Sequence, residues 1–275
     1  DEAQILFGDL HVQSTFSTDA FLWSMPIYGG EGVYPIADAC DYARYCSGID
    51  FWAITDHAEA TTKKRWSQTK QSLRDCNARA GDPSNPDMIS YLGFEWSQVG
   101  ATPETHYGHK NVIFEGLEDK ELAMRPIASG GLATEVLRNQ SSNMMPRSTV
   151  FLDFENRQVY YDIRKYLSEI GEAPSCDPSL PSNELPDDCF EIAETPADLV
   201  ERLGQQNLNP LIIPHGSSWG FYTPFRTTWD KQLKAAMYPE KFKLIEIMSG
   251  HGNSEEYRDY ELSLIHISEP TRRIT

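Results

Sequence analysis

The chain has 275 residues, of which 40% are hydrophobic and 24% are charged, and its formal net charge is −17 at pH 7. This composition is ordinary for a globular protein, and no apolar run approaches the roughly 18 residues that a membrane span requires. The excess of acidic residues argues against a nonspecific DNA or RNA binder, because it would repel the phosphates. We therefore expect neither a nucleic acid nor a membrane as a partner.

The first part of the chain alternates apolar runs with amphipathic or polar segments. Short apolar runs between polar residues predict buried strands, whereas apolar residues at helical spacing predict helices. In chain order, the predicted elements are a strand at 5–12, a helix at 34–47, a strand at 49–55, a helix at 60–80, and strands at 88–96 and 111–115.

The second part is less regular, above all between residues 116 and 190. Polar and proline-rich composition predicts loops, and Pro196 favours the start of a helix. The predicted elements are loops at 141–148 and 173–188, a helix at 195–205, and strands at 211–214 and 242–248. Strands that alternate with helices indicate an α/β fold.

Polar residues recur where the predicted strands end or begin: His11, His57, Glu95, His109 and His215. A lone histidine or glutamate in such a place is usually structural, so the argument depends on the recurrence. In α/β barrels the functional side chains gather at one end of the strands. Histidine and carboxylate side chains are ligands of zinc, manganese and iron, and a bound cation would balance charges that are otherwise costly to bury.

Several short motifs resemble those of the polymerase-and-histidinol-phosphatase (PHP) superfamily. Residues 8–15 are similar to its opening His-x-His motif, and Asp56-His57 is similar to its second motif. Gly93-Phe94-Glu95-Trp96 resembles the segment with a metal-bridging glutamate, and the segments around His109 and His215 resemble later histidine motifs. Within the superfamily the chain is most similar to the bacterial DUF3604 group, through residues 51–59, 92–96, 213–222 and 249–257. The resemblance covers residues 5–261.

The resemblance implies a distorted (β/α)7 barrel and two or three divalent ions, zinc, manganese or iron. The metal ligands that it implies are His11, Asp19, His57, Glu95, His109 and His215, with Gln13 at the position of the second histidine of the opening motif. Gln13 is a departure, because an amide carbonyl binds transition metals weakly. Either one metal position is altered or this subgroup tolerates glutamine.

Four further polar residues are candidates for contacts to the ligands or to a substrate: Asp56, His106, Asn111 and His251. His106 lies three residues before His109 and could orient a ligand, and His251 lies in a glycine-flanked loop. A turn histidine bonded to the backbone is an equally good explanation of His251. The sequence identifies no catalytic side chain beyond the ligands.

The last residues differ from the rest. Residues 262–272 read as the in-frame translation of a sequencing-library adapter, so we expect 1–261 to form a PHP-like domain and 262–275 to be an artefactual tail. His266 in this tail is excluded from the site. No Asp-x-His motif of the kind that ends PHP domains precedes Glu261, so we expect a C-terminally truncated, unclosed barrel with an incomplete site.

The five cysteines show no CxxC spacing, which argues against a structural zinc site. Cys176 and Cys189 bracket the proline-rich loop and are predicted to form a disulfide, and Cys46 could pair with Cys76. Buried free thiols are the alternative. Disulfides would indicate a periplasmic or secreted protein, with a cytoplasmic location as the alternative.

The leading functional hypothesis is a metal-dependent hydrolase with a metal-activated water. The resemblance implies a phosphoester, and hence an anionic small molecule, as its substrate. One alternative is hydrolysis of an amide or a carboxylic ester. Another is a degenerate metal-binding module without catalysis, for which Gln13 is the best support.

Overall fold

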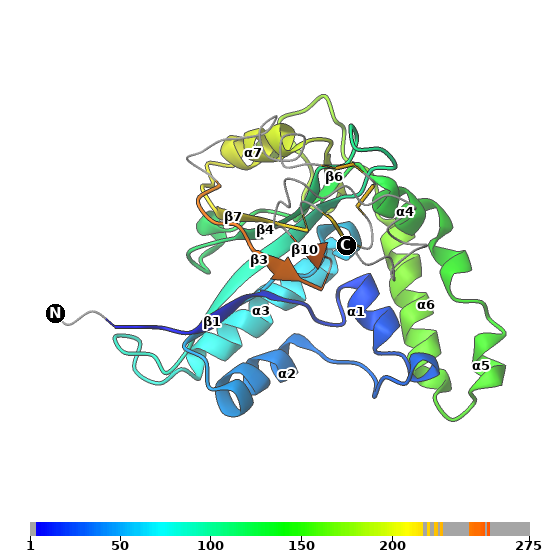
Figure 1. The fold of residues 1–275 in the computed structure, drawn as a ribbon, viewed down its shortest axis with the longest axis horizontal. Coiled ribbons are helices and arrows are strands. Elements are labelled where there is room, and N and C mark those ends of the chain that lie inside the picture. Colours follow the sequence, from blue (N-terminus) through cyan, green and yellow to red (C-terminus); the bar gives the residue numbers. More distant parts are fainter. Residues whose placement is uncertain are drawn as a thin grey trace, which may run out of the picture.

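The computed structural model describes residues 4–216, 219–220, 223–224, 226–227, 242–250 and 252–253. They form a mixed α/β fold around a curled sheet of five strands (Figure 1). The strands are β1 (Gly8–Val12), β2 (Phe51–Ile54), β3 (Ile89–Gln98), β4 (Gly108–Ile113), β5 (Ile127–Ser129), β6 (Glu191–Ala193), β7 (Leu211–His215), β8 (Trp219–Gly220), β9 (Met248–Ser249) and β10 (Gly252–Asn253). The helices are α1 (Thr18–Trp23), α2 (Ile36–Asp41), α3 (Lys63–Ala78), α4 (Leu132–Met144), α5 (Thr149–Leu152), α6 (Arg157–Glu172) and α7 (Pro196–Gln205). Single helical turns lie at η1 (Pro26–Tyr28), η3 (Ala58–Ala60), η4 (Asp119–Glu121) and η5 (Ser182–Glu184), and the π-helical segment η2 (Tyr42–Ser47) continues α2.

The main sheet has the strand order β1-β2-β3-β4-β7. Strands β1, β2 and β3 run parallel, whereas β4 is antiparallel to both of its neighbours, β3 and β7. The start of β4 therefore lies beside the ends of β3 and β7. This antiparallel strand departs from the all-parallel arrangement of the predicted (β/α)7 barrel.

The two faces of the sheet differ because side chains alternate along each strand. On one face, Trp52, Ile54, Phe94 and Trp96 pack into the main hydrophobic core against α2 and α3. The intervening residues of β3, among them Glu95, point to the other face. The alternation thus places large apolar side chains under the helices, whereas the opposite face carries the polar side chains around Glu95 together with a smaller apolar cluster that includes Ala53, Ile113 and Ile213.

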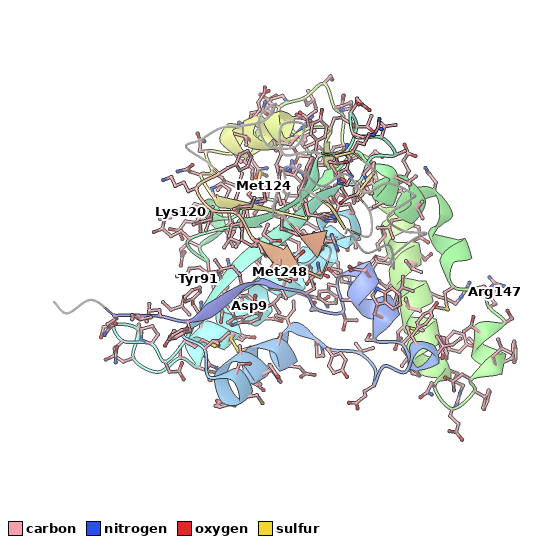
Figure 2. The ribbon with its side chains drawn as sticks, in the orientation of Figure 1. Asp9, Tyr91, Lys120, Met124, Arg147 and Met248 are labelled. Carbon is pink, nitrogen blue, oxygen red and sulfur yellow. A yellow bond between two sulfur atoms is a disulfide. The ribbon has the colours of Figure 1, made fainter. Side chains whose placement is uncertain are left out.

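Local sequence signals explain the helices that cover the sheet. Thr62 caps α3 by accepting a hydrogen bond from the backbone of Arg65, and buried side chains such as Trp66 and Leu73 then recur at helical spacing. The helices α4, α5 and α6 form a group at one side of the molecule (Figure 1). Their own core includes Ile163 and Leu167 on the inner face of α6. Figure 2, in the same orientation, marks Arg147 between α4 and α5.

Most predicted elements of the first part are present, with shifted bounds, but three expectations for the second part are wrong. The region 116–190 contains two long helices, α4 and α6, and α4 runs through residues 141–144, where a loop was expected. The predicted strand at 242–248 is a strand only from Met248 onward. The segment before it lies along β7, where the backbone N–H of Glu246 donates to the carbonyl of Pro214.

Two disulfides cross-link the described chain. Cys176–Cys189 closes the proline-rich loop as predicted. The other bond joins Cys40 to Cys76, so the predicted pairing of Cys46 with Cys76 is wrong. Cys40 lies on the buried side of α2, facing α3, whereas Cys46 is exposed. The prediction chose the right pair of helical segments but the wrong cysteine.

None of the helices in the described part of the chain combines the length and the apolar character that a membrane span requires. The adapter-like residues 262–275, His251 and His266 lie outside the described residues.

Candidate metal centre

Glu95 is the centre of a cluster of polar side chains on the face of the sheet opposite to α2 and α3. Its side chain is fully buried. Its Oε1 lies 2.7 Å from Nδ1 of His109 and 3.1 Å from Nε2 of His215. Its Oε2 lies 3.2 Å from Nε2 of His11 and accepts a hydrogen bond of 2.6 Å from the amide of Gln13. A single carboxylate on β3 thus contacts side chains from β1 and its end, from β4 and from β7.

The register of the strands explains this convergence. His57 lies three residues after the end of β2 and forms an isolated parallel bridge with Glu95. Across β4, His109 pairs with Ser97 on one side and with His215 on the other. Directly paired residues point to the same face of a sheet. His109 therefore reaches the site from the start of β4, whereas the other residues lie within or beyond the ends of strands that run in the opposite direction.

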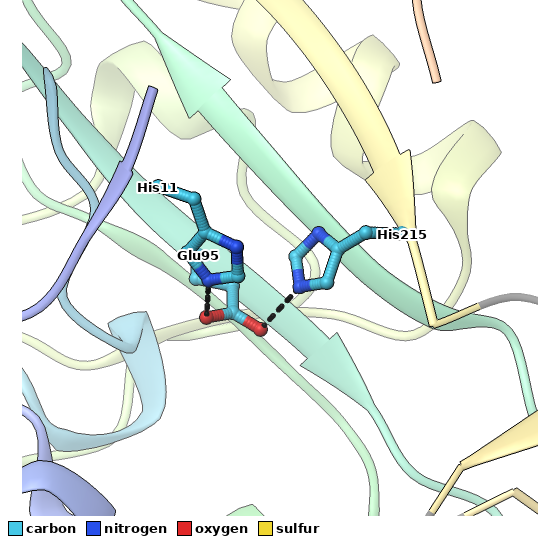
Figure 3. Close-up of side chains that lie close together, drawn as sticks. All are labelled: His11, Glu95 and His215. Carbon is cyan, nitrogen blue, oxygen red and sulfur yellow. Dashed lines mark hydrogen bonds and ion pairs between the residues drawn. The ribbon is translucent and has the colours of Figure 1, made fainter. Parts of the chain in front are cut away.

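His11, Glu95 and His215 form the tightest group (Figure 3). One ligand atom from each lies within 4.8 Å of the other two. Two ligand atoms that are each about 2.0–2.2 Å from one zinc-like ion are at most about 4.4 Å apart, so this group lies close to coordinating distances. Two imidazoles and one carboxylate are also the protein ligands of a known class of catalytic zinc site. This group could hold a metal ion, although the donors alone do not identify the metal.

Asp19 and His57 form a second group beside the first. Nε2 of His57 lies 3.3 Å from Oδ2 of Asp19 and 3.6 Å from Oε2 of Glu95. Burial would lower the pKa of the His57 imidazole, but the two carboxylates raise it well above its usual value. Burial would raise the pKa of Asp19, and the neighbouring His57 lowers it. The pair shares Glu95 with the first group, so the carboxylate lies between two sets of donors.

The charges around Glu95 favour its ionised form. Burial alone would raise the pKa of this carboxyl group. The charges of His57 and His215 and the hydrogen bonds with His109 and His11 outweigh burial and hold the pKa well below its usual range. The carboxylate is therefore negative at neutral pH and needs positive charge around it. Protonated imidazoles or a bound cation can supply that charge.

Ser97 fixes the orientation of two of the histidines. Its hydroxyl oxygen lies 2.9 Å from Nδ1 of His57 and 2.9 Å from Nδ1 of His109, and it also lies within hydrogen-bonding distance of Glu95. Behind it, the buried carboxylate of Glu59 accepts hydrogen bonds from the backbone N–H groups of Ser97 and Ser129. Groups that bond the outer side of ligand side chains hold them in place for a metal.

Glu246 belongs to the cluster, although no sequence motif pointed to it. Its two carboxylate oxygens lie 3.1 and 3.0 Å from Nδ1 of His11, and one lies 3.7 Å from Nδ1 of His215. Burial would lower the pKa of His11, but Glu246 and Glu95 together raise it to about 10. A lone acidic residue within the apolar run from Leu244 to Met248 was the available signal.

The residues predicted to support the site lie in different places. Asp56 accepts hydrogen bonds from the backbone and the hydroxyl of Ser14, which anchors the segment after β1. Burial raises the pKa of Asp56 to about 6. Asn111 pairs with Glu95 across the sheet, and its amide has no hydrogen-bond partner within the described residues.

His106 does not join the cluster. It is buried, and neither ring nitrogen has a hydrogen-bond partner among the residues that the structure describes. Burial and the charge of Lys110 lower its pKa to about 4. The expectation that His106 orients a ligand therefore has no contact to support it.

Comparisons with protein-family models, with curated proteins and with solved structures find no match for this chain. The resemblance to the PHP superfamily accordingly stays a prediction from the motifs. Function has to be argued from the chemistry of the side chains that the fold brings together.

Proposed function

We propose that this chain is a metal-dependent hydrolase in which the cluster around Glu95 binds divalent cations and acts on a phosphoester. The observation that carries the proposal is the group of His11, Glu95 and His215, whose ligand atoms lie within 4.8 Å of one another. Burying acids and imidazoles costs free energy unless their charges are balanced, and a bound cation would provide that balance. Such clusters of ionisable side chains are common at functional sites.

The positions of the residues indicate which of them would bind each cation. His11, Glu95 and His215 would hold one cation, and Asp19 and His57 would hold a second one that shares Glu95. A divalent cation in such a site polarises the substrate oxygens and lowers the pKa of a coordinated water into the neutral range.

The remaining residues would orient these ligands. Glu246 holds His11 from its outer side, and Ser97 holds His57 and His109. His109 and Gln13 complete the surroundings of Glu95, and either side chain can take part in coordination when a third cation is bound.

A PHP-type barrel of the DUF3604 group is the family that we propose for the chain. The parallel order of β1, β2 and β3 and the placement of the motif residues on one face support it. The antiparallel β4 is the feature that a barrel of this family would have to accommodate. A periplasmic or secreted location is also proposed, because two disulfides are typical of oxidising compartments.

The test combines metal analysis with a substrate screen. The metal content of the purified protein is measured after loading with zinc, manganese or iron(II). Activity is then assayed on p-nitrophenyl phosphate, p-nitrophenyl acetate and a p-nitroanilide. We expect stoichiometric metal and hydrolysis of the phosphoester. Activity on only the acetate or the anilide would favour the alternative substrate classes, and bound metal without any hydrolysis would favour a degenerate module.

The matched variants are Glu95→Gln and Glu135→Gln, the second at an exposed position on α4. Glu95→Gln removes the charge at the centre of the cluster and should lower metal affinity by about 100-fold or more. Glu135→Gln should leave metal affinity unchanged. Equal metal binding by the wild type and Glu95→Gln would refute the proposed site.

A further inference from the structure

A cavity of about 310 Å³ adjoins the cluster on the side of α4. Asp19, His57 and His109 line it where it meets the candidate metal centre. A molecule in this cavity would therefore lie directly beside the residues that are proposed to hold the cations. Its volume is at the lower end of the range for small-molecule sites, roughly 300–1,000 Å³.

The wall opposite the cluster is apolar. Ala133, Val136 and Leu137 of α4 face the cavity, at the spacing of neighbouring turns on one side of a helix. Leu22 at the end of α1 and Val99 just after β3 extend this wall. These side chains come from three separate segments and meet at one place, so they form a pocket wall and not an isolated exposed residue.

The charges around the cavity argue against an anionic group in the part of the cavity that lies away from the cluster. No lysine or arginine is among the described residues that line it. The carboxylates that do line it, Asp19 and Glu59, would repel a second negative group. Glu59 is in addition engaged by the backbone N–H groups of Ser97 and Ser129. The chemistry of the lining thus fits a neutral apolar group beside a charged reacting group.

We infer that this cavity holds a neutral apolar substituent of the substrate, about the size of one aromatic ring, while the bond to be cleaved lies against His57 and His109. This inference rests on the proposed hydrolase function and adds a substrate class to it: monoesters of small aromatic or similarly bulky apolar alcohols. Binding energy from the buried ring would position the ester at the cluster.

The experiment compares two stable anions that differ only in the apolar group, phenylphosphonate and methylphosphonate. Their affinities for the metal-loaded protein are measured by calorimetry in the wild type, in Ala133→Phe and in Asn139→Phe. Ala133→Phe fills the cavity, and Asn139→Phe places the same ring at an exposed position of α4 outside the cavity. Benzyl alcohol, which carries the ring without the anion, is titrated into the metal-free proteins by NMR.

We expect phenylphosphonate to bind the wild type at least about tenfold more tightly than methylphosphonate, because burial of a ring removes apolar surface from water. Ala133→Phe should abolish this preference and leave metal content unchanged, and Asn139→Phe should keep the preference. Equal affinities in the wild type, or a preference that survives in Ala133→Phe, would overturn the inference.

The two proposals can fail separately. Hydrolysis without any preference for the ring would support the hydrolase proposal and refute the apolar subsite. If no metal binds, the hydrolase proposal fails. The titration of benzyl alcohol then tests by itself whether the cavity binds an apolar ligand. Binding that Ala133→Phe abolishes supports an apolar ligand site, and no binding to the wild type refutes it.

Discussion

Oε2 of Glu246 lies 3.0 Å from Nδ1 of His11, although the two residues are 235 positions apart in the chain. The other ring nitrogen of His11 lies 3.2 Å from Glu95. His11 is thus held between two carboxylates, one at the centre of the cluster and one at its rim. A histidine that ligates a metal through one nitrogen commonly bonds a carboxylate through the other, which fixes its orientation.

Replacement of Glu246 by glutamine should therefore weaken metal binding without unfolding the protein. We expect a loss of about 10–100-fold in affinity, the usual effect of removing a residue that orients a ligand. A competition titration against a chromogenic chelator measures it, with Glu135→Gln as the control. An unchanged affinity would show that Glu246 does not support His11 in the metal-loaded protein.

Metal binding should release protons. The pKa of His11 is raised to about 10 and that of His57 lies well above 6.5, so both imidazoles carry protons at pH 7 in the metal-free chain. A cation can bind these nitrogens only after their protons leave. Affinity should accordingly increase with pH. Calorimetry in two buffers of different ionisation enthalpy should give at least about one released proton per ion, and identical enthalpies in both buffers would contradict this expectation.

The metal-free protein should lose stability as the pH rises from about 6.5 to about 10. The folded-state pKa of His11 is raised from 6.5 to about 10. Its contribution to stability is therefore complete below pH 6.5 and disappears as the pH rises through 10. Thermal melts in a chelator across this range measure the effect. In His11→Gln this part of the pH dependence should be absent, and a wild-type profile in that variant would assign it to other groups.

The disulfides give a prediction that does not depend on function. Denatured, unreduced protein should expose one reactive thiol, that of Cys46. Loss of either bond, through Cys76→Ser or Cys189→Ser, should lower the free energy of unfolding by about 2–4 kcal/mol. Cys46→Ser is the matched control and should unfold in urea like the wild type. Five thiols in the titration would refute both bonds.

The sequence predicted those features of the fold that depend on local patterns of residues. Apolar runs marked the strands of the main sheet, and the polar residues at their ends marked the side of the fold on which Glu95 and the histidines gather. It did not predict that β4 is antiparallel, although the connection from Gln98 to Gly108 is shorter than the crossover that parallel strands need. Glu246 was missed for another reason: it is 235 positions from His11 in the chain, and a single acid in an apolar run has meaning only once His11 is placed beside it.

Gln13 offers a test of whether the site is a working or a degenerate one. Its amide already lies 2.6 Å from Oε2 of Glu95, at the position where the PHP resemblance expects a histidine. An imidazole there would present a better ligand for zinc, manganese or iron than an amide. Gln13→His should therefore raise metal affinity by about tenfold.

The exposed Gln158 on α6 provides the control, since Gln158→His adds an imidazole away from the cluster. Tighter binding together with faster hydrolysis would identify position 13 as a weakened ligand of an active centre. Unchanged or weaker binding would instead show that Gln13 acts by holding Glu95, and that the cation sites are complete without it.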